Sequence, residues 1–376
     1  MVKISNFQLY TILVIYLAPL AYLEIPQVLA NRLQQNAWMA GFLAIIPGYF
    51  MVFILSQILK KSRYPFPQLV IEHLGQPLGK VIGFSYIWLF IFLASYTLRF
   101  FTDFIETNVL PGTPISIHIG VLILVLVIGI RSGIGNLARL VEVVSVIGIA
   151  FALILVVLIM GQQGSVERLL PLGHLDYKNL ALATGGTMYI VGRLFIVLTL
   201  GFWCQNKSQI PSIMIKALWT YVLLIGVTTV ATIMTFGPVI TSVLTFPTFS
   251  MVTLVNVGNF IQNIDIIFIG IWILGAYGVI VMSWFMACYC TQVLFNLRDY
   301  KFLAAASSLL IGITSILISA NILELLVVSR VIIPVIESLF FIVIPFLILL
   351  VIIIKSHLND NTMPDMQQKK ERGKTA

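Results

Sequence analysis

The sequence predicts an all-α integral membrane protein with about ten transmembrane helices, built as two inverted five-helix repeats in which helices 1 and 6 are broken. Three observations predict this class. Of the 376 residues, 60% are hydrophobic and only 10% are charged, against roughly 25% charged in a soluble domain. Apolar stretches recur along almost the whole chain. Polar and helix-breaking residues interrupt two of these stretches, each at the start of one half.

Ten stretches are close to the roughly 20 residues that a helix needs to cross a hydrocarbon core. The predicted spans are 6–29, 37–58, 81–107, 115–131, 138–161, 181–204, 212–236, 264–295, 302–319 and 330–354. They form one membrane domain over 1–356, with repeats at about 6–161 and 181–354. Residues 357–376 are expected to be a disordered cytoplasmic tail.

Basic residues indicate the orientation of the chain. Placing the N-terminus in the cytoplasm puts most loop lysines and arginines on that side, as the positive-inside rule requires. Both termini are then cytoplasmic, and 64–74 is expected to lie along the inner surface. The first 30 residues also imitate a secretory signal peptide, but Glu24 and two prolines favour a transmembrane helix.

Several function classes find no support in the sequence. The net charge of +8 comes from membrane-flanking loops and the tail, so it does not indicate nucleic acid. The three cysteines have no metal-ligand or disulfide spacing. No catalytic motif is present. We therefore expect no enzyme activity, no metal and no cofactor.

The interruptions point to a ligand cavity. The first span is interrupted at 18–20 and 24–26, and the sixth at Gly185-Gly186 and Gly192-Arg193. Lipid offers no hydrogen-bond partners, so irregular backbone at membrane depth must face a cavity, a ligand or buried protein. Matching interruptions in two halves are typical of inverted-repeat transporters. The alternative is that proline and glycine simply kink these helices.

Charged residues inside the spans are candidates for the site. A carboxylate such as Glu24 costs about 3 kcal/mol at the centre of a membrane helix, so we expect it to contact a ligand or to reach the outer interface. Arg193 requires a carboxylate partner, for which Glu24, Glu142 and Glu337 are available. It either forms a structural ion pair or contacts a ligand directly.

A polar stripe is expected on the third span. Tyr96, Arg99, Asp103 and Glu106 follow helical spacing and share one face. They line an external vestibule or mark the headgroup end of the helix. Tyr277, between Gly275 and Gly278, interrupts the eighth span and lines a cavity or lies at the interface.

The chain resembles the B-subunit family of spore germinant receptors, the endospore germination permeases. This family lies within the amino acid, polyamine and organocation transporter superfamily. The resemblance runs from Ile4 to about Lys355. It rests on Ile4-Ser5-Asn6-Phe7-Gln8-Leu9, Gln35-Asn36-Ala37-Trp38, Leu110-Pro111-Gly112-Thr113-Pro114, and the stretch from Phe246-Pro247 through Phe260-Ile261-Gln262-Asn263-Ile264-Asp265 to Ile271-Trp272.

The resemblance implies an amino-acid-permease-like (LeuT-like) fold and a nutrient-sensing subunit in the spore inner membrane. Its partners would be an A-type subunit and a C-type lipoprotein subunit. A small germinant, such as an amino acid or a sugar, would bind between helices 1, 3, 6 and 8. The candidate ligand-binding residues are Glu24, Tyr96, Phe100, Arg193, Leu194, Tyr277 and Val281.

The chain departs from the family pattern at three places. Asn36 replaces a commonly acidic residue, Gln262-Asn263 replaces a Glu-Arg pair, and Glu24 stands where small residues are common. Glu24 would disfavour a ligand carboxylate and favour a sugar, an amine or a cation. Two other functions remain open: an amino-acid or cation symporter, and a scaffold that binds no ligand.

Overall fold

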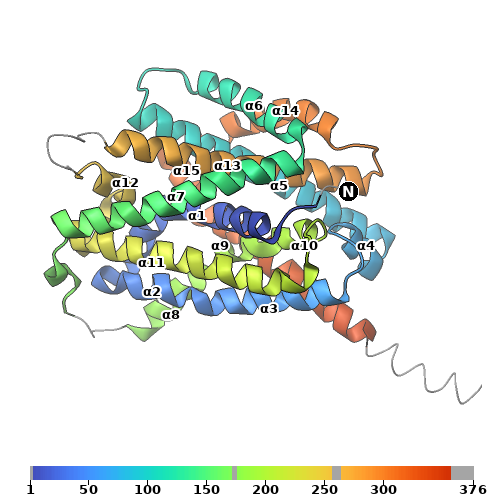
Figure 1. Ribbon diagram of the computed structural model, residues 1–376, viewed down its shortest axis with the longest axis horizontal. Helices are drawn as coiled ribbons and strands as arrows, with labels where there is room; N and C mark the ends of the chain where they lie inside the picture. Colours follow the sequence, from blue (N-terminus) through green and yellow to red (C-terminus); the bar gives the residue numbers. More distant parts are fainter. Residues whose placement is uncertain (1–2, 172–175, 256–263, 357–376) are drawn as a thin grey trace, which may run out of the picture.

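The computed structural model describes residues 3–171, 176–255 and 264–356. The tail from 357 and the Phe260–Asn263 part of the family resemblance lie outside the described residues. Within them the chain is helical, apart from one isolated bridge between Ile4 and Cys204. The helices run along the long axis of the molecule (Figure 1). They are α1 Asn6–Leu33, α2 Ala37–Leu43, α3 Ile45–Lys61, α4 Gln68–Leu74, α5 Gln76–Asn108, α6 Ile115–Ser132, α7 Ile134–Gln163, α8 Tyr177–Gly186, α9 Met188–Gly192, α10 Val197–Leu200, α11 Ile210–Val243, α12 Pro247–Val252, α13 Ile264–Leu294, α14 Lys301–Leu317, α15 Ile322–Val327 and α16 Ile333–Ser338.

The predicted number of spans agrees with these helices. Eight helical segments of the described chain are long and apolar enough to cross a membrane, and Lys301–Leu317 is a shorter apolar helix. The first long segment, Asn6–Lys61, turns back at Gln34, where φ is +51°, and therefore crosses twice. The described chain thus contains ten spans.

The first span differs from the expectation of an unwound break. α1 starts with a capping box, in which the Ser5 hydroxyl accepts from the Gln8 amide and Gln8 accepts from the Ser5 amide. It then continues to Leu33 with two prolines inside it. Pro26 has no amide hydrogen for the carbonyl of Tyr22, which instead accepts a 2.6 Å bond from Thr248. The prolines therefore interrupt single hydrogen bonds rather than the whole helix.

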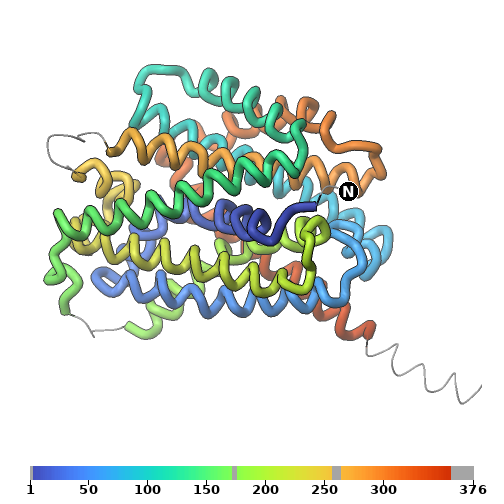
Figure 2. The backbone as a smooth tube through the Cα atoms, viewed as in Figure 1, coloured from blue at the N-terminus to red at the C-terminus, as the bar shows by residue number. Residues whose placement is uncertain are grey.

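The sixth span is broken in the predicted places. α8 ends at Gly186, α9 ends at Gly192, and a 3₁₀ turn over Arg193–Ile196 leads into α10. Figure 1 labels α8, α9 and α10 as separate short helices, and the backbone of this segment can be followed by its colour in Figure 2. Gly192 lies against Phe341, because a Cβ atom there would be 3.0 Å from the Phe341 Cβ. The close approach brings the break in the sixth span against the last helix.

The last span contains two local irregularities. Between α15 and its end at Ser356, π-helical turns occupy Val328–Ile332 and Leu339–Val343. One carbonyl in the second turn, that of Phe340, accepts from the Tyr86 hydroxyl of α5. Such turns occur often at functional sites in other proteins. This irregular helix lies beside both α1 and the sixth span.

α1 lies in the middle of the bundle, in contact with α11, α7 and α13 (Figure 1). Most of its residues are buried, and the Tyr16 hydroxyl pairs with Ser283 of α13 at 3.1 Å. A second pair, α5 and α13, packs beside it. Because α1 is enclosed by its neighbours, polar groups in it must find partners inside the protein.

The described chain begins and ends at the same end of the bundle, on the right in Figure 1. Lys355, near the end of the last helix, donates to the carbonyl of His73 in α4 at 2.7 Å. The start of α1 is held to Trp203 and Gln205 by backbone hydrogen bonds. Both ends lying together is consistent with an even number of spans.

Candidate functional site

A polar cavity lies beside the second half of α1. It has a volume of about 350 Å³ between α1, the break in the sixth span and the last helix. A much smaller space of about 10 Å³ adjoins it and extends to Arg193. The two spaces share Glu24, Ile25, Tyr189 and Ser329, and together they are called the polar cavity below. Its other polar lining residues are Gln27, Asn31, Arg32, Tyr96, Thr187, Arg193 and Arg330.

Glu24 lies where the two spaces meet. Its residue is only 9% exposed, so it does not reach the surface of the molecule. The Ser329 hydroxyl lies 2.9 and 2.8 Å from the two carboxylate oxygens. A hydroxyl has one proton to donate, whereas a carboxylate offers about four acceptor positions. Most of the acceptor capacity of Glu24 is therefore available to a ligand.

Two tyrosines form the walls beside Glu24. Tyr96 comes from α5 and Tyr189 from α9, and both line the smaller space. Tyr96 is 2% exposed and lines the smaller space together with Glu24 and Ser329. The carboxylate, the serine and the tyrosine thus meet at one space, although they come from three different spans.

Arg193 is paired with Glu337 of α16. Its Nη2 lies 2.8 Å from Oε1 and its Nε lies 2.9 Å from Oε2, so the contact is bidentate. Glu337 is fully buried. Of the three carboxylates that the sequence offered, Arg193 therefore uses Glu337, and not Glu24 or Glu142. The pair links the broken sixth span to the last helix at the edge of the polar cavity.

The other candidate residues do not line the polar cavity. Phe100 is buried and packs its ring 5.7 Å from that of Phe246. Leu194 and Val281 are fully buried. Tyr277 faces α6, where its hydroxyl would clash with a Cβ placed on Gly129. The eighth span therefore contributes none of its candidates to this cavity.

The polar stripe of the third span divides into two parts. Tyr96 faces the polar cavity, but Arg99 and Asp103 pair with each other at 2.8 Å. Both are buried, and Arg99 also donates to the carbonyl of Ile316 in α14 at 3.5 Å. Tyr96 therefore faces the polar cavity, whereas Arg99 and Asp103 face each other and α14, so the stripe does not line a single space.

The last helix contributes residues to the cavity that were not predicted from the sequence. Ser329, Arg330 and Pro334 line the cavity from this helix, in place of the eighth span. A signal was available, since Ser329-Arg330 followed by Pro334 interrupts the apolar sequence near residue 330. That interruption coincides with the first π-helical turn.

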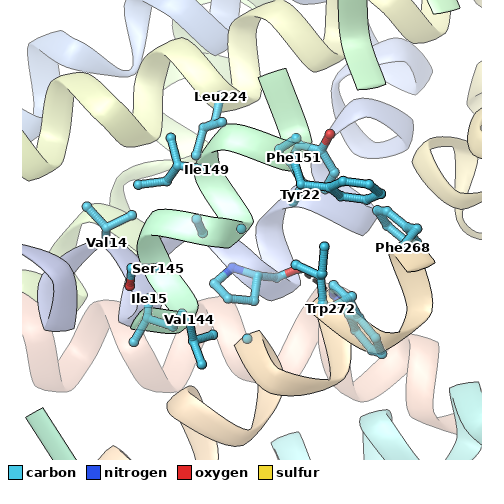
Figure 3. Close-up of a pocket in the computed structure, with 16 residues that line it drawn as sticks. Val14, Ile15, Tyr22, Val144, Ser145, Ile149, Phe151, Leu224, Phe268 and Trp272 are labelled. Atoms are coloured by element: carbon cyan, nitrogen blue, oxygen red, sulfur yellow. Dashed lines mark hydrogen bonds between the residues drawn. The ribbon is translucent and has the colours of Figure 1, made fainter. Parts of the chain in front are cut away.

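A second cavity, of about 80 Å³, is apolar (Figure 3). It lies between α1, α7, α11 and α13, and its lining includes Val14, Tyr22, Ile149 and Trp272. The indole of Trp272 donates to the carbonyl of Pro19 at 2.9 Å. Ser145 donates to the carbonyl of Thr11 at 3.0 Å. These two polar groups are already bonded, and most of the remaining lining is apolar.

Metal binding finds no support among the described residues. No group of three or more histidine, cysteine, aspartate or glutamate side chains lies close enough to hold an ion. The polar cavity contains one carboxylate, three arginines and several neutral donors and acceptors.

The fold is that of a membrane transporter. A solved structure of Mhp1, a transporter of the nucleobase-cation-symport-1 family in a closed conformation with bromovinylhydantoin bound, matches with a TM-score of 0.62. The match covers 91% of this chain and 79% of the transporter at 15% sequence identity. At this identity the similarity establishes the fold alone.

Sequence comparison identifies the family. The putative spore germination protein YfkT of Bacillus subtilis (strain 168) is 23% identical over 333 residues, which are 87% of this chain and 90% of that protein. Spore germination protein KB of the same organism is 25% identical over 336 residues, 86% of this chain and 87% of that protein. The family model described as spore germination protein matches residues 3–323. The chain is a multi-pass membrane protein that belongs to this spore germination permease family.

Proposed function

We propose that this protein is the nutrient-sensing subunit of a spore germinant receptor, which binds a small polar germinant in the polar cavity. One observation carries the proposal: Glu24 is buried in the centre of the bundle with a single donor, at the inner end of a cavity of about 350 Å³. Intramembrane carboxylates usually mark a ligand or ion pathway. Membership in the germination family supports the biological role.

The germinant would present an amine or hydroxyl group to Glu24. Arg32 and Arg330 line the same cavity. A ligand with a donor at one end and an anionic group at the other, such as an amino acid, is thus accommodated, although Glu24 alone would disfavour a carboxylate. A sugar would use the neutral donors and acceptors instead. No catalytic step is part of this proposal.

The receptor would act by a shift between two arrangements of the bundle. A ligand changes such an equilibrium only by the difference between its affinities for the two states. A germinant that occupies the remaining acceptor positions of Glu24 adds contacts beside the bond to Ser329, and would favour the arrangement of α1 and the last helix in which those contacts fit best. A-type and C-type subunits in the spore inner membrane would detect the change, with both termini of this chain in the cytoplasm.

The dose dependence of germination tests the site in spores that rely on this protein. Glu24→Gln keeps the side-chain size but removes the charge, and we expect at least a tenfold increase in the germinant concentration needed. Gly186→Leu should have a similar effect by filling the cavity, since a Cβ there meets no atom within 4 Å.

Gly185→Leu is the matched control. A Cβ at Gly185 also meets no atom within 4 Å, but this residue does not line the cavity. Its dose response should equal that of the wild type, with equal protein levels verified by immunoblot. Unchanged responses for both Glu24→Gln and Gly186→Leu would remove the polar cavity from the mechanism and favour a scaffold that binds no ligand.

A transporter is the second candidate function, because a solved transporter shares the fold. The structural relative is a cation symporter, and fold alone does not separate sensing from transport. Proteoliposomes that contain only this chain should accumulate no labelled amino acid or sugar if the protein is a receptor subunit. Concentrative uptake that Glu24→Gln abolishes would instead identify a symporter.

A further inference from the structure

A groove between the starts of α1 and α11 lies at the opposite end of α1 from the polar cavity. It has a volume of about 600 Å³. Two hydrogen bonds hold its walls together, Tyr10 to Thr220 at 2.8 Å and Asn6 to Gln209 at 2.5 Å. We call it the headgroup groove. Its lining includes Phe7, Tyr10, Ser212, Lys216 and Trp219.

The polar part of the headgroup groove suits an anion. Lys216 is exposed, and no described carboxylate forms an ion pair with it. Ser212 lies one turn away on the same face of α11 and adds a hydroxyl donor. Ser212 lies in the first turn of a long helix, where the backbone dipole also favours negative charge.

The apolar part of the groove continues directly from the polar part. Trp219 lies three residues after Lys216 on the same helix face, is 51% exposed and donates to the Tyr49 hydroxyl at 3.0 Å. Phe7 is 48% exposed and stacks on Tyr10 at 5.8 Å. Rings of this kind are typical of the level where lipid headgroups meet the acyl chains. A free phosphate ion would leave these rings without a role.

The surroundings also carry positive charge. Lys3, Lys60 and Lys61 lie at the same end of the bundle, because α3 ends where α1 and α11 begin. Basic pockets between transmembrane helices are a general means of binding anionic headgroups.

We propose that the headgroup groove binds one anionic phospholipid from the adjacent leaflet. Lys216 and Ser212 bind the phosphate, and an acyl chain lies against Trp219. A bound lipid would bridge the starts of α1 and α11.

Native mass spectrometry of the full-length protein tests the proposal. The purified chain is mixed with equal amounts of phosphatidylglycerol and phosphatidylcholine in mild detergent. We expect one retained phosphatidylglycerol in at least tenfold preference. Lys216→Gln should reduce that preference at least fivefold. Lys207→Gln is the matched control, since Lys207 is at the same end but lies 4.2 Å from the centroid of the Phe202 ring, outside the groove; its preference should be unchanged.

Three outcomes would overturn the proposal. They are no preference in the wild type, an equal loss in both lysine variants, and displacement of the lipid by millimolar inorganic phosphate. The last would identify a free-anion site. Because the assay contains no germinant, its result is independent of the proposed function of the polar cavity.

A second measurement uses the wild-type protein and does not depend on folding of Lys216→Gln. Brominated phosphatidylglycerol should quench tryptophan fluorescence more than brominated phosphatidylcholine does. The chain has six tryptophans, so Trp219→Phe identifies the contribution of Trp219. If the difference between the two lipids persists in Trp219→Phe, the lipid does not bind in this groove and the proposal fails.

Discussion

The pair between Arg193 and Glu337 is the most buried charge contact among the described residues. Glu337 is fully buried and Arg193 is 7% exposed. Burying two charges has a large desolvation cost, which a bidentate geometry offsets. The pair fixes the 3₁₀ turn of the sixth span to the last helix, so removal of one partner leaves the other charged and unpaired.

Replacing only one residue of the Arg193–Glu337 pair should therefore lower the free energy of unfolding more than replacing both. We expect Glu337→Met and Arg193→Met each to destabilise the protein by about 3–5 kcal/mol, while the double variant with both substitutions loses much less. Thermal unfolding in detergent measures this, with exposed Arg32→Gln as a neutral control. If the double variant shows the sum of the two single losses, the pair does not stabilise the fold as an ion pair.

The predictable part of the site consists of its charged residues. Glu24 and Arg193 are conspicuous in sequence because a charge in an apolar span is rare, and both line the polar cavity. Ser329 was not predicted, because a serine in a membrane helix bonds its own backbone readily and gives no signal by itself. Its role depends on the packing of two spans that are 305 residues apart in sequence.

At the scale of helices, the sequence predicted the number of spans better than it predicted the geometry inside each span. Ten spans were expected and ten are found in the described chain. The predicted tenth span started at 330, whereas the apolar helix begins at Ile322. Its two π-helical turns could not be predicted, because they arise from contacts such as that between Phe340 and Tyr86. Proline did not unwind α1, because other helices supply donors to the carbonyls near it.

Close packing of α4 against α5 depends on Gly79. A Cβ at this position would lie 2.5 Å from the Cα of Ile71, which is backbone and cannot move alone. We expect Gly79→Ala to force the two helices apart and to destabilise the protein by about 1–3 kcal/mol. Thermal unfolding of the purified protein measures the loss.

Gly120→Ala is the control that separates the steric clash at Gly79 from the change in helix propensity. A Cβ at Gly120, in α6, meets nothing within 4 Å. Alanine favours a helix by up to about 1 kcal/mol over glycine, so this variant should unfold at the same temperature or higher. An equal loss in both variants would show that α4 is not packed closely on α5.

At the scale of the whole molecule, the two ends of the bundle differ in charge. The end that holds the start of α1 also holds Lys60, Lys61, Arg298 and Lys301, at the ends of α3, α13 and α14. The polar cavity opens near the other end of α1, where Arg32 is located. The positive-inside rule predicts that the basic end is cytoplasmic. A germinant arriving from outside would then meet the polar cavity first.

Cysteine accessibility tests this orientation directly. The native cysteines Cys204, Cys288 and Cys290 are buried and should give little background labelling. In sealed right-side-out vesicles, Val166→Cys and Tyr177→Cys should react with a membrane-impermeant maleimide, because both residues are exposed at the end opposite the basic one. Arg63→Cys and Asp299→Cys, exposed at the basic end, should react only after detergent opens the vesicles. The reverse pattern would place both termini and the headgroup groove outside. Labelling of one position from each pair would contradict the ten-span arrangement itself, since an even number of crossings requires each pair to share a side.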